Sequence, residues 1–429
     1  MAYPFARWTF RRGERVFDLH PETFRVIPAG EGSRDTLPSV RGSTGESVLV
    51  MVRVGAHRIT ATAGRCTDLD IDEPIGSRVG KTHVRPSRAR GRGADRPTGK
   101  LVMTPQEIER LTVRYGELVP CRTAFIDAHT PGSDRKENFT IIGGGVSESP
   151  DQHVHVRQTP GFNIGAAGQP PGCRNSLHSH RTAEVFFVLK GRWRFFWGRH
   201  GKAGETVLEE GDLFDIPTHM FRGFENVGED YGMIMAVLGG DDAGGGVIWA
   251  PEVIAEAADH GLVLAESGVL YDTRRGQRLP EGVAPMKPLE GEELERLGNP
   301  SAEEVVPRYV ARYRDLVERS ATAPVRVLGE NALIEDRPGF EIDLISRESL
   351  GDEPYATDRH EVLMPFRGHW RLDWDGGTTV LNPGDTCLVP QGLSRRLYPS
   401  MSGEASLYRI RNTDDPAGPT RAPTNTASA

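Results

Sequence analysis

The strongest constraint on the fold is an internal repeat. The run PGFNI at Pro160 recurs as PGFEI at Pro338, EVFFVLKGRWRFFW at Glu184 as EVLMPFRGHWRLDW at Glu361, and GDLFDIP at Gly211 as GDTCLVP at Gly384. Because the order of these runs is kept over most of a domain, the pattern indicates the duplication of one domain. The chain has 429 residues, which is enough for two or three domains.

The repeated unit consists of short apolar runs separated by clusters of Gly, Pro and Asp. From about residue 137 these runs are ENFTIIGGGV, HVHVRQ, GFNIGAAG, EVFFVLKGRWRFFW, GDLFDIPTHMF and YGMIMAVLGG. The 50 glycines and 31 prolines are typical of a protein with many turns. This spacing predicts an all-β fold of the barrel or jelly-roll type.

The same reading predicts five segments along the chain. They are a low-order N-terminal extension (1–102), a first barrel (103–245), a mixed helical connector (246–324), a second barrel (325–413) and a disordered tail (414–429). Thr104 begins a helix, with Pro105 at its first position and Glu107 at the capping-box position. In the connector we predict one helix at PEVIAEAADHG and another, capped by Ser301, that runs on through PRYVARYRDLVERS.

Charge and composition restrict the partners. The formal net charge of −8 disfavours nucleic acid and anionic membranes as partners. The basic run from Lys81 to Lys100 has two interpretations, a flexible linker or a nucleic-acid-binding arm. The linker is favoured because no aromatic residues lie between the arginines. We therefore expect a small-molecule partner, and the sequence leaves open whether the chain forms a homo-oligomer.

Cysteine spacing and apolar runs bear on the compartment. The four cysteines show no paired spacing, which favours a reducing compartment. No apolar run has the length of a membrane span, and the arginine-rich first residues lack the apolar core of a secretory signal. These features predict a cytoplasmic protein.

The run GCRNSLHSHRTAEVFFVLKG carries the candidate chemistry. His178 and His180 are two residues apart, so on one strand both imidazoles point to the same face, and Glu184 begins the next apolar run. Two imidazoles and one carboxylate suit a divalent metal, most simply Fe(II), with Mn, Ni, Cu or Zn as alternatives. The other interpretation is a buried polar cluster without metal.

These residues resemble the cupin superfamily, whose first motif is G(X)5HXH(X)3-4E(X)6G. Gly172, His178, His180, Glu184 and Gly191 fit it without a gap. The resemblance covers roughly residues 137–240 and 325–413, and so implies a bicupin, with two jelly-roll barrels.

The second motif of the family, G(X)5PXG(X)2H(X)3N, is matched with two departures. Gly211, Pro217 and Asn226 fit, but Arg222 occupies the position of the last histidine ligand and His219 that of a glycine. Arg222 could bind an anionic group of a substrate, or could pair with an acid such as Glu184 or Glu225. His219 could supply a fourth ligand or could lie in the turn after Pro217.

The second copy departs further from the motif. Tyr355 and Thr357 stand at the histidine positions and Arg395 at the last ligand position, so that only Glu361 is kept. We therefore expect a second barrel without metal.

Phe186 and Trp193 belong to an aromatic run that either lines the substrate site or fills the barrel core. The resemblance implies a metal-dependent enzyme, since bicupins similar to this chain include ring-cleaving dioxygenases. The leading hypothesis is an oxygenase acting on a hydroxylated or carboxylated aromatic or enolic molecule of anionic character, with Arg222 as the anion-binding catalytic residue. The alternatives are an isomerase, epimerase or lyase, and a non-catalytic ligand-binding protein.

Overall fold

The computed structural model describes residues 101–240, 246–351 and 353–414, together with the backbone of five strands nearer the N-terminus. The chain divides into two compact units, residues 1–94 and 95–429. In the first unit, β1 (Trp8–Arg12) pairs with β2 (Arg15–Leu19) and β3 (Ser39–Arg41), and β4 (Leu49–Val54) pairs with β5 (His57–Thr62). The predicted extension at 1–102, its basic run and the tail at 414–429 lie largely outside the described residues and stay predictions.

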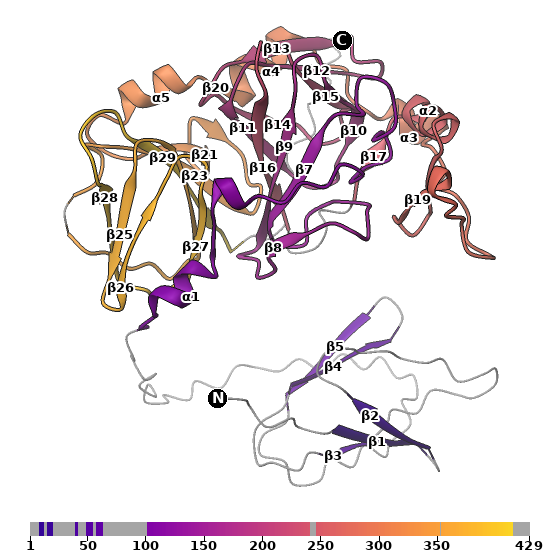
Figure 1. Ribbon diagram of the computed structural model, residues 1–429, viewed down its shortest axis with the longest axis horizontal. Coiled ribbons are helices and arrows are strands. Elements are labelled where there is room, and N and C mark those ends of the chain that lie inside the picture. Colours follow the sequence, from indigo (N-terminus) through magenta and orange to yellow (C-terminus); the bar gives the residue numbers. More distant parts are fainter. Residues whose placement is uncertain are drawn as a thin grey trace, which may run out of the picture. The chain divides into compact units, whose positions relative to one another are not determined.

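The first barrel consists of two sheets, antiparallel except for the parallel pair β7–β8 (Figure 1). The larger has the order β20-β14-β11-β16-β9-β7-β8, where β20 is Val310–Ala311, and the smaller the order β13-β12-β15-β10-β17. The strands are β7 (Glu137–Ile142), β8 (Val154–Val156), β9 (Phe162–Gln169), β10 (Arg174–Ser179), β11 (Glu184–Lys190), β12 (Trp193–Trp197), β13 (Gly204–Leu208), β14 (Leu213–Ile216), β15 (Arg222–Asn226), β16 (Gly232–Gly239) and β17 (Ile248–Trp249).

In the second barrel, the larger sheet repeats this strand order, while the smaller sheet has three strands. The two sheets run β22-β21-β23-β29-β24-β27-β6, where β6 is Thr112–Val113, and β26-β25-β28. The strands are β21 (Val325–Gly329), β22 (Ile334–Glu335), β23 (Phe340–Ser346), β24 (Glu361–Arg367), β25 (Trp370–Trp374), β26 (Gly377–Leu381), β27 (Thr386–Val389), β28 (Arg395–Pro399) and β29 (Ser406–Asn412). The predicted all-β fold with two barrels is confirmed.

Period-two alternation explains how the barrels are filled. Along β12, Trp193, Phe195 and Trp197 are buried while the residues between them are only partly so, as expected for a strand with one face inward. The rings of Phe195 and Phe224 lie 5.7 Å apart inside the barrel. Burying a large apolar side chain of this kind stabilises a fold by about 1.5–3 kcal/mol.

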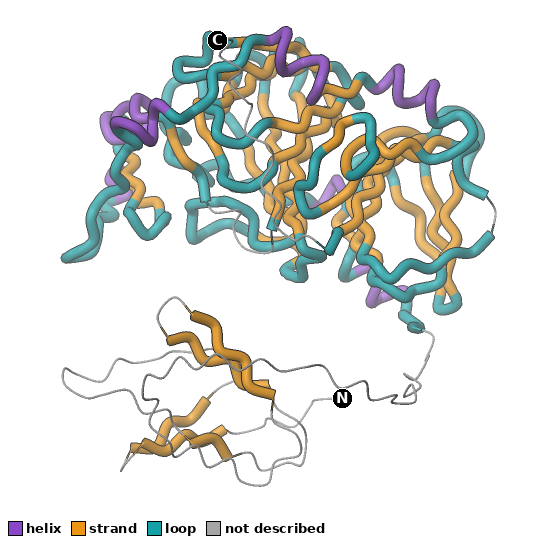
Figure 2. The backbone as a smooth tube through the Cα atoms, turned by 180° about the vertical axis from the view of Figure 1, so that it is seen from behind, coloured by secondary structure: helices purple, strands orange, loops and turns teal. Residues whose placement is uncertain are grey.

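The outward faces of the two large sheets pack against each other. Phe162 and Phe340 face each other with ring centroids 5.5 Å apart, and Phe187 lies 4.9 Å from Tyr408. This shared core contains residues of both barrels, which is why β11 and β24 are buried on both faces. Figure 2 shows the two strand blocks side by side from behind.

The segment before the first barrel joins the second barrel. The predicted helix is present as α1 (Pro105–Glu109), with the capping box between Thr104 and Glu107. It is short because β6 (Thr112–Val113) then pairs with Thr386 and Cys387 of β27. Arg114 binds Asp385 at 2.9 Å, and a 3₁₀ turn (Tyr115–Glu117) follows.

The segment before the second barrel joins the first barrel in the same way. The single helix predicted after Ser301 is instead two helices, α4 (Ala302–Tyr309) and α5 (Tyr313–Arg319). Between them β20 (Val310–Ala311) pairs with β14, and Arg312 binds Asp212 at 2.6 Å. We call residues 105–115 and 302–313 the exchanged segments. Residues 105–115, predicted as part of the first barrel, thus pair with the second barrel, and residues 302–313, predicted as part of the connector, pair with the first barrel.

The connector covers one side of the first barrel. It contains β17, α2 (Pro251–Asp259), β18 (Leu262–Leu264), β19 (Leu270–Asp272), a 3₁₀ turn (Thr273–Arg275) and α3 (Gly291–Glu295). Its apolar residues pack with Ile126 and Phe221 of the barrel. In the described part of the chain, no helix is long and apolar enough to cross a membrane.

Candidate metal centre

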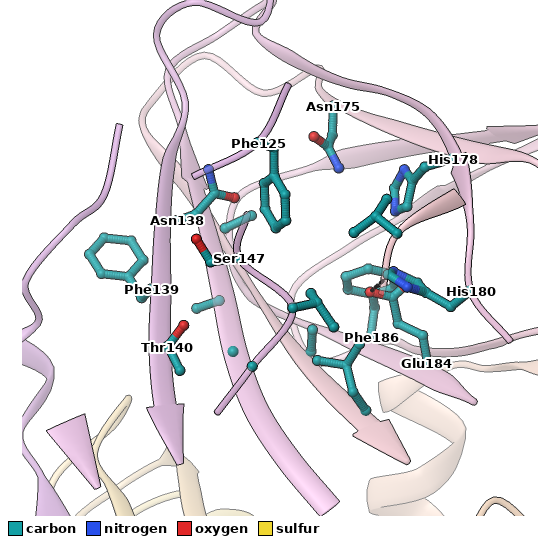
Figure 3. Close-up of a pocket in the computed structure, with 18 of the residues that line it drawn as sticks. Phe125, Asn138, Phe139, Thr140, Ser147, Asn175, His178, His180, Glu184 and Phe186 are labelled. Atoms are coloured by element: carbon teal, nitrogen blue, oxygen red, sulfur yellow. Dashed lines mark ion pairs between the residues drawn. The ribbon is translucent and has the colours of Figure 1, made fainter. Parts of the chain in front are cut away.

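His178, His180 and Glu184 come together at one end of the first barrel (Figure 3). One ligand atom from each of the three residues lies within 4.8 Å of the others. His178 lies in β10, His180 directly follows this strand and Glu184 begins β11, so a short turn brings the three together. All three side chains are buried, and the group could hold a metal ion.

Backbone carbonyls orient both imidazoles. Nδ1 of His178 lies 2.8 Å from the carbonyl oxygen of Ser176, and Nδ1 of His180 lies 2.9 Å from that of Gly246. Since a carbonyl only accepts, each Nδ1 carries the hydrogen and each Nε2 keeps its lone pair for a ligand role. Burial and the nearby Arg222 cation lower the pKa of His178 well below its usual value. His178 is therefore neutral, as a metal ligand must be.

Arg222 is paired with Glu184. Its Nε and Nη2 atoms donate to Oε2 of Glu184 at 3.2 and 2.5 Å. Burial by itself would raise the pKa of Glu184, but the Arg222 charge lowers it below its usual range. Glu225 pairs with Arg194 instead. Of the two interpretations of Arg222 from the sequence, the structure has the ion pair with an acid. Glu184 is therefore an ionised carboxylate.

His219 lies away from this group. Its side chain is exposed, and its backbone has φ of 57°, the left-handed conformation that favours glycine. The equivalent residue of the second barrel is Gly392, with φ of 79°. The structure thus places His219 in the turn after Pro217, where the resemblance has glycine, and not among the grouped ligand atoms.

A cavity opens beside the three side chains. Its empty volume, including the opening to solvent, is about 600 Å³. Phe186 lines it, whereas Trp193 is fully buried in the barrel core and does not. Arg222 is also absent from the lining. The structure therefore brings only one of the three predicted substrate-contacting residues to the cavity.

Trp249 and Asn175 are among the lining residues that sequence reasoning missed. Trp249 comes from the connector, where β17 pairs with His178, and its indole ring lies 5.4 Å from that imidazole. No local sequence pattern predicts this pairing. Asn175 is three residues before His178, which on a regular strand would place it on the opposite face. The register of β10 on β15 shifts between these two residues, and this bulge explains why both line the cavity.

In the second barrel, Glu361 is surrounded by arginines. Oε2 accepts from Arg395 and, at 3.3 Å, from the Tyr355 hydroxyl. Oε1 accepts from Arg411 at 2.8 Å and lies 3.8 Å from Arg409. Both carboxylate oxygens are therefore engaged by protein groups. Glu184 differs, because its Oε1 lies 3.5 Å from Nε2 of His180.

Residues 168–238 match the family model of the cupin domain. The first barrel belongs to the cupin superfamily. This cupin barrel holds the His178, His180 and Glu184 group. The larger sheet of the second barrel has the same strand order.

Similar proteins share this fold over different lengths. A germin-like protein (subfamily 1 member 4) of Arabidopsis thaliana is 29% identical over 135 residues, which is 29% of this chain and 59% of that protein. The chain therefore matches less than two thirds of that relative. Oxalate decarboxylase of B. subtilis aligns over 74% of this chain and 80% of its own, with 14% identity and a TM-score of 0.43. Salicylate 1,2-dioxygenase of Pseudaminobacter salicylatoxidans aligns over 70% and 83%, with 15% identity and a TM-score of 0.42.

Proposed function

We propose that the first cupin barrel binds a divalent metal through His178, His180 and Glu184 and acts on a small organic molecule in the adjoining cavity. The observation that carries this proposal is the position of an oriented three-ligand group in the wall of an apolar cavity. The reaction we propose is oxygenation, most simply by a dioxygenase acting on a hydroxylated or carboxylated aromatic or enolic molecule.

The residues present fit a metal of the Fe(II), Mn(II), Ni(II), Cu(II) or Zn(II) class. Two imidazole nitrogens and one carboxylate oxygen form a mixed set that suits these ions and leaves coordination positions open. When bound, such an ion supplies either redox chemistry with dioxygen or Lewis-acid polarisation of a carbonyl. Of the five candidates we propose Fe(II), because this ligand set is that of non-haem iron oxygenases.

The protein's own residues would prepare this centre. The carbonyls of Ser176 and Gly246 hold the imidazoles in the ligand tautomer, and Arg222 keeps Glu184 ionised. Phe186 and Trp249 provide apolar walls that exclude water, which strengthens electrostatic interactions inside the cavity.

Elemental analysis and oxygen uptake test the proposal. Protein expressed without added metal should contain close to one equivalent of a transition metal, and His178→Ala should lose it. The matched control is His153→Ala, an exposed histidine outside the cavity lining. Oxygen consumption with a panel of hydroxybenzoates, flavonols and diketones should depend on His178. Turnover without oxygen would assign an isomerase, epimerase or lyase instead.

One observation favours a ligand-binding protein without metal as the second candidate. The Arg222–Glu184 pair of the first barrel recurs as Arg395–Glu361 in the second, so the guanidinium could balance the carboxylate in both. The metal is preferred because the second oxygen of Glu184 faces His180, whereas the second oxygen of Glu361 is bound by another arginine, Arg411. This second candidate would be favoured if the purified protein contained no metal and if His178→Ala behaved like the parent protein in every assay.

A further inference from the structure

A buried ion pair lies behind the cavity wall. Lys136 and Asp127 are both fully buried and bonded to each other. Asp127 also accepts from the backbone N–H of Ser176 at 3.0 Å. Nζ of Lys136 donates to Oδ1 of Asn175 at 2.6 Å. The three side chains form a chain that ends at the cavity, because Asn175 lines it while Lys136 and Asp127 do not.

This chain fixes the orientation of the Asn175 amide. A lysine only donates, so the atom of Asn175 that faces it must be the carbonyl oxygen, and the NH₂ group is turned the other way. Figure 3 shows the amide nitrogen on the side that faces the cavity and His178. Reversing the amide would point NH₂ at a buried ammonium group, which is strongly unfavourable. Asn175 therefore presents a hydrogen-bond donor beside the candidate ligands.

The cavity offers donors without positive charge. Among the described residues, no lysine or arginine lines it. Arg222 is bound to Glu184 and Lys136 to Asp127, so neither guanidinium nor ammonium is free to bind a ligand. A second amide, Nδ2 of Asn138, is buried in the same lining and has no partner among the described residues. The remaining wall is largely aromatic and aliphatic.

We propose that the cavity selects an uncharged, largely apolar small molecule whose acceptor oxygen binds the Asn175 amide. The only anionic group that the ligand carries is one that ligates the metal. For this metal-binding end of the ligand alone, the inference rests on the proposed function. An ionised carboxylate in this apolar cavity would lose its hydration without gaining a cation. A ketone or hydroxyl oxygen loses much less hydration free energy on entering the cavity, and it gains the hydrogen bond from the Asn175 amide.

Two matched probe pairs test this ligand class with the full-length protein. Protein stripped of metal with EDTA is titrated calorimetrically with acetophenone and with benzoate. The two probes share a phenyl ring, but acetophenone carries a methyl ketone where benzoate carries a carboxylate. Protein loaded with Zn²⁺ is titrated with 2-hydroxyacetophenone and with phthalate. The uncharged member of each pair should bind about tenfold more tightly or better.

Variants connect the preference to Asn175. Asn175→Leu should weaken acetophenone binding about five- to tenfold. Asn175→Asp keeps the shape of the side chain and its contact with Lys136 but replaces the hydrogen-bond donor by an acceptor, so it should also weaken acetophenone binding. This second variant tests the inference even if Asn175→Leu does not fold. Arg174→Ala is the control, since Arg174 is the exposed neighbour of Asn175 on β10 and lies outside the cavity lining.

The outcomes separate this inference from the proposed metal. If benzoate binds metal-free protein as tightly as acetophenone, if acetophenone does not bind, or if Asn175→Asp has no effect, the ligand class is wrong. If Zn²⁺ does not bind while acetophenone binds in an Asn175-dependent manner, the ligand class stands and the metal centre fails.

Discussion

Arg222 donates two hydrogen bonds to one oxygen of Glu184, and both residues are almost fully buried. The pair occupies the place where the cupin resemblance has a fourth histidine ligand. Its equivalent in the second barrel, Arg395 with Glu361, is also buried. A guanidinium–carboxylate pair is thus a feature of both barrels, and only the first barrel adds two imidazoles to it.

Replacing this arginine should strengthen metal binding. Arg222→His removes a buried positive charge next to the metal position and places an imidazole at the family's ligand position. We expect the Kd for Zn²⁺ to fall about tenfold or more, as measured by competition with a chromophoric chelator. The control is Arg395→His in the second barrel, which should not create a site, because Tyr355 and Thr357 stand at the histidine positions there. An unchanged Kd for Arg222→His would contradict the proposed centre.

Removing the Glu184 carboxylate should abolish metal binding and lower the stability of the fold. Glu184→Gln leaves the Arg222 guanidinium buried without a counter-charge, so the free energy of unfolding should fall by about 3–5 kcal/mol. The double variant Glu184→Gln with Arg222→Met should recover most of this loss but still bind no metal. Urea unfolding and elemental analysis check the two effects separately. A single variant as stable as the parent would show that the pair is not buried as described.

Asp215 predicts a pH-dependent stability. It is 1% exposed on β14, and its equivalent in the second barrel is Leu388. Burial and the adjacent Asp336 carboxylate raise the pKa of Asp215 well above the usual 3.8. The stability that protonated Asp215 contributes is therefore complete below about pH 4 and is lost as pH rises through the raised folded-state pKa.

The test of this effect is Asp215→Leu. At pH 7–8 this variant should gain about 1–3 kcal/mol, because the parent must keep a proton or bury a charge. At pH 4 the gain should be much smaller. Thermal melting across this range measures the difference, and an equal gain at both pH values would contradict the raised pKa.

His219→Gly distinguishes a turn residue from a metal ligand. Because His219 has positive φ, glycine should relieve strain and stabilise the protein by about 1 kcal/mol. The affinity for Zn²⁺ should stay the same. A loss of Zn²⁺ affinity in this variant would instead identify His219 as a fourth ligand that moves in when metal binds.

The exchanged segments predict where the chain tolerates truncation. A chain that begins at Met103 keeps α1, β6 and the Arg114–Asp385 pair, so it should melt at the same temperature as the full-length protein. A chain that begins at Gly116 loses all three, and its Tm should fall by about 5 °C or more. If the Met103 chain is insoluble, the N-terminal unit is required for folding after all.

Several features were predictable because they depend on neighbours in the sequence. Alternation along Trp193, Phe195 and Trp197 shows which face of the strand is buried, whatever its partner. The spacing of His178 and His180 places both on one face of one strand, and the capping box at Thr104 is a contact within one turn. The repeat then implied two barrels from one pattern.

By itself, then, the sequence determined the fold class, the duplication and the three grouped side chains. Only the tertiary structure decided the partner of Arg222, the exchange of the segments and the position of Trp249 in the cavity wall. These depend on pairing between residues far apart in the chain, about which local periodicity carries no information. The bulge between Asn175 and His178 shows the limit most clearly, because one extra residue in a strand reverses the face of every side chain beyond it.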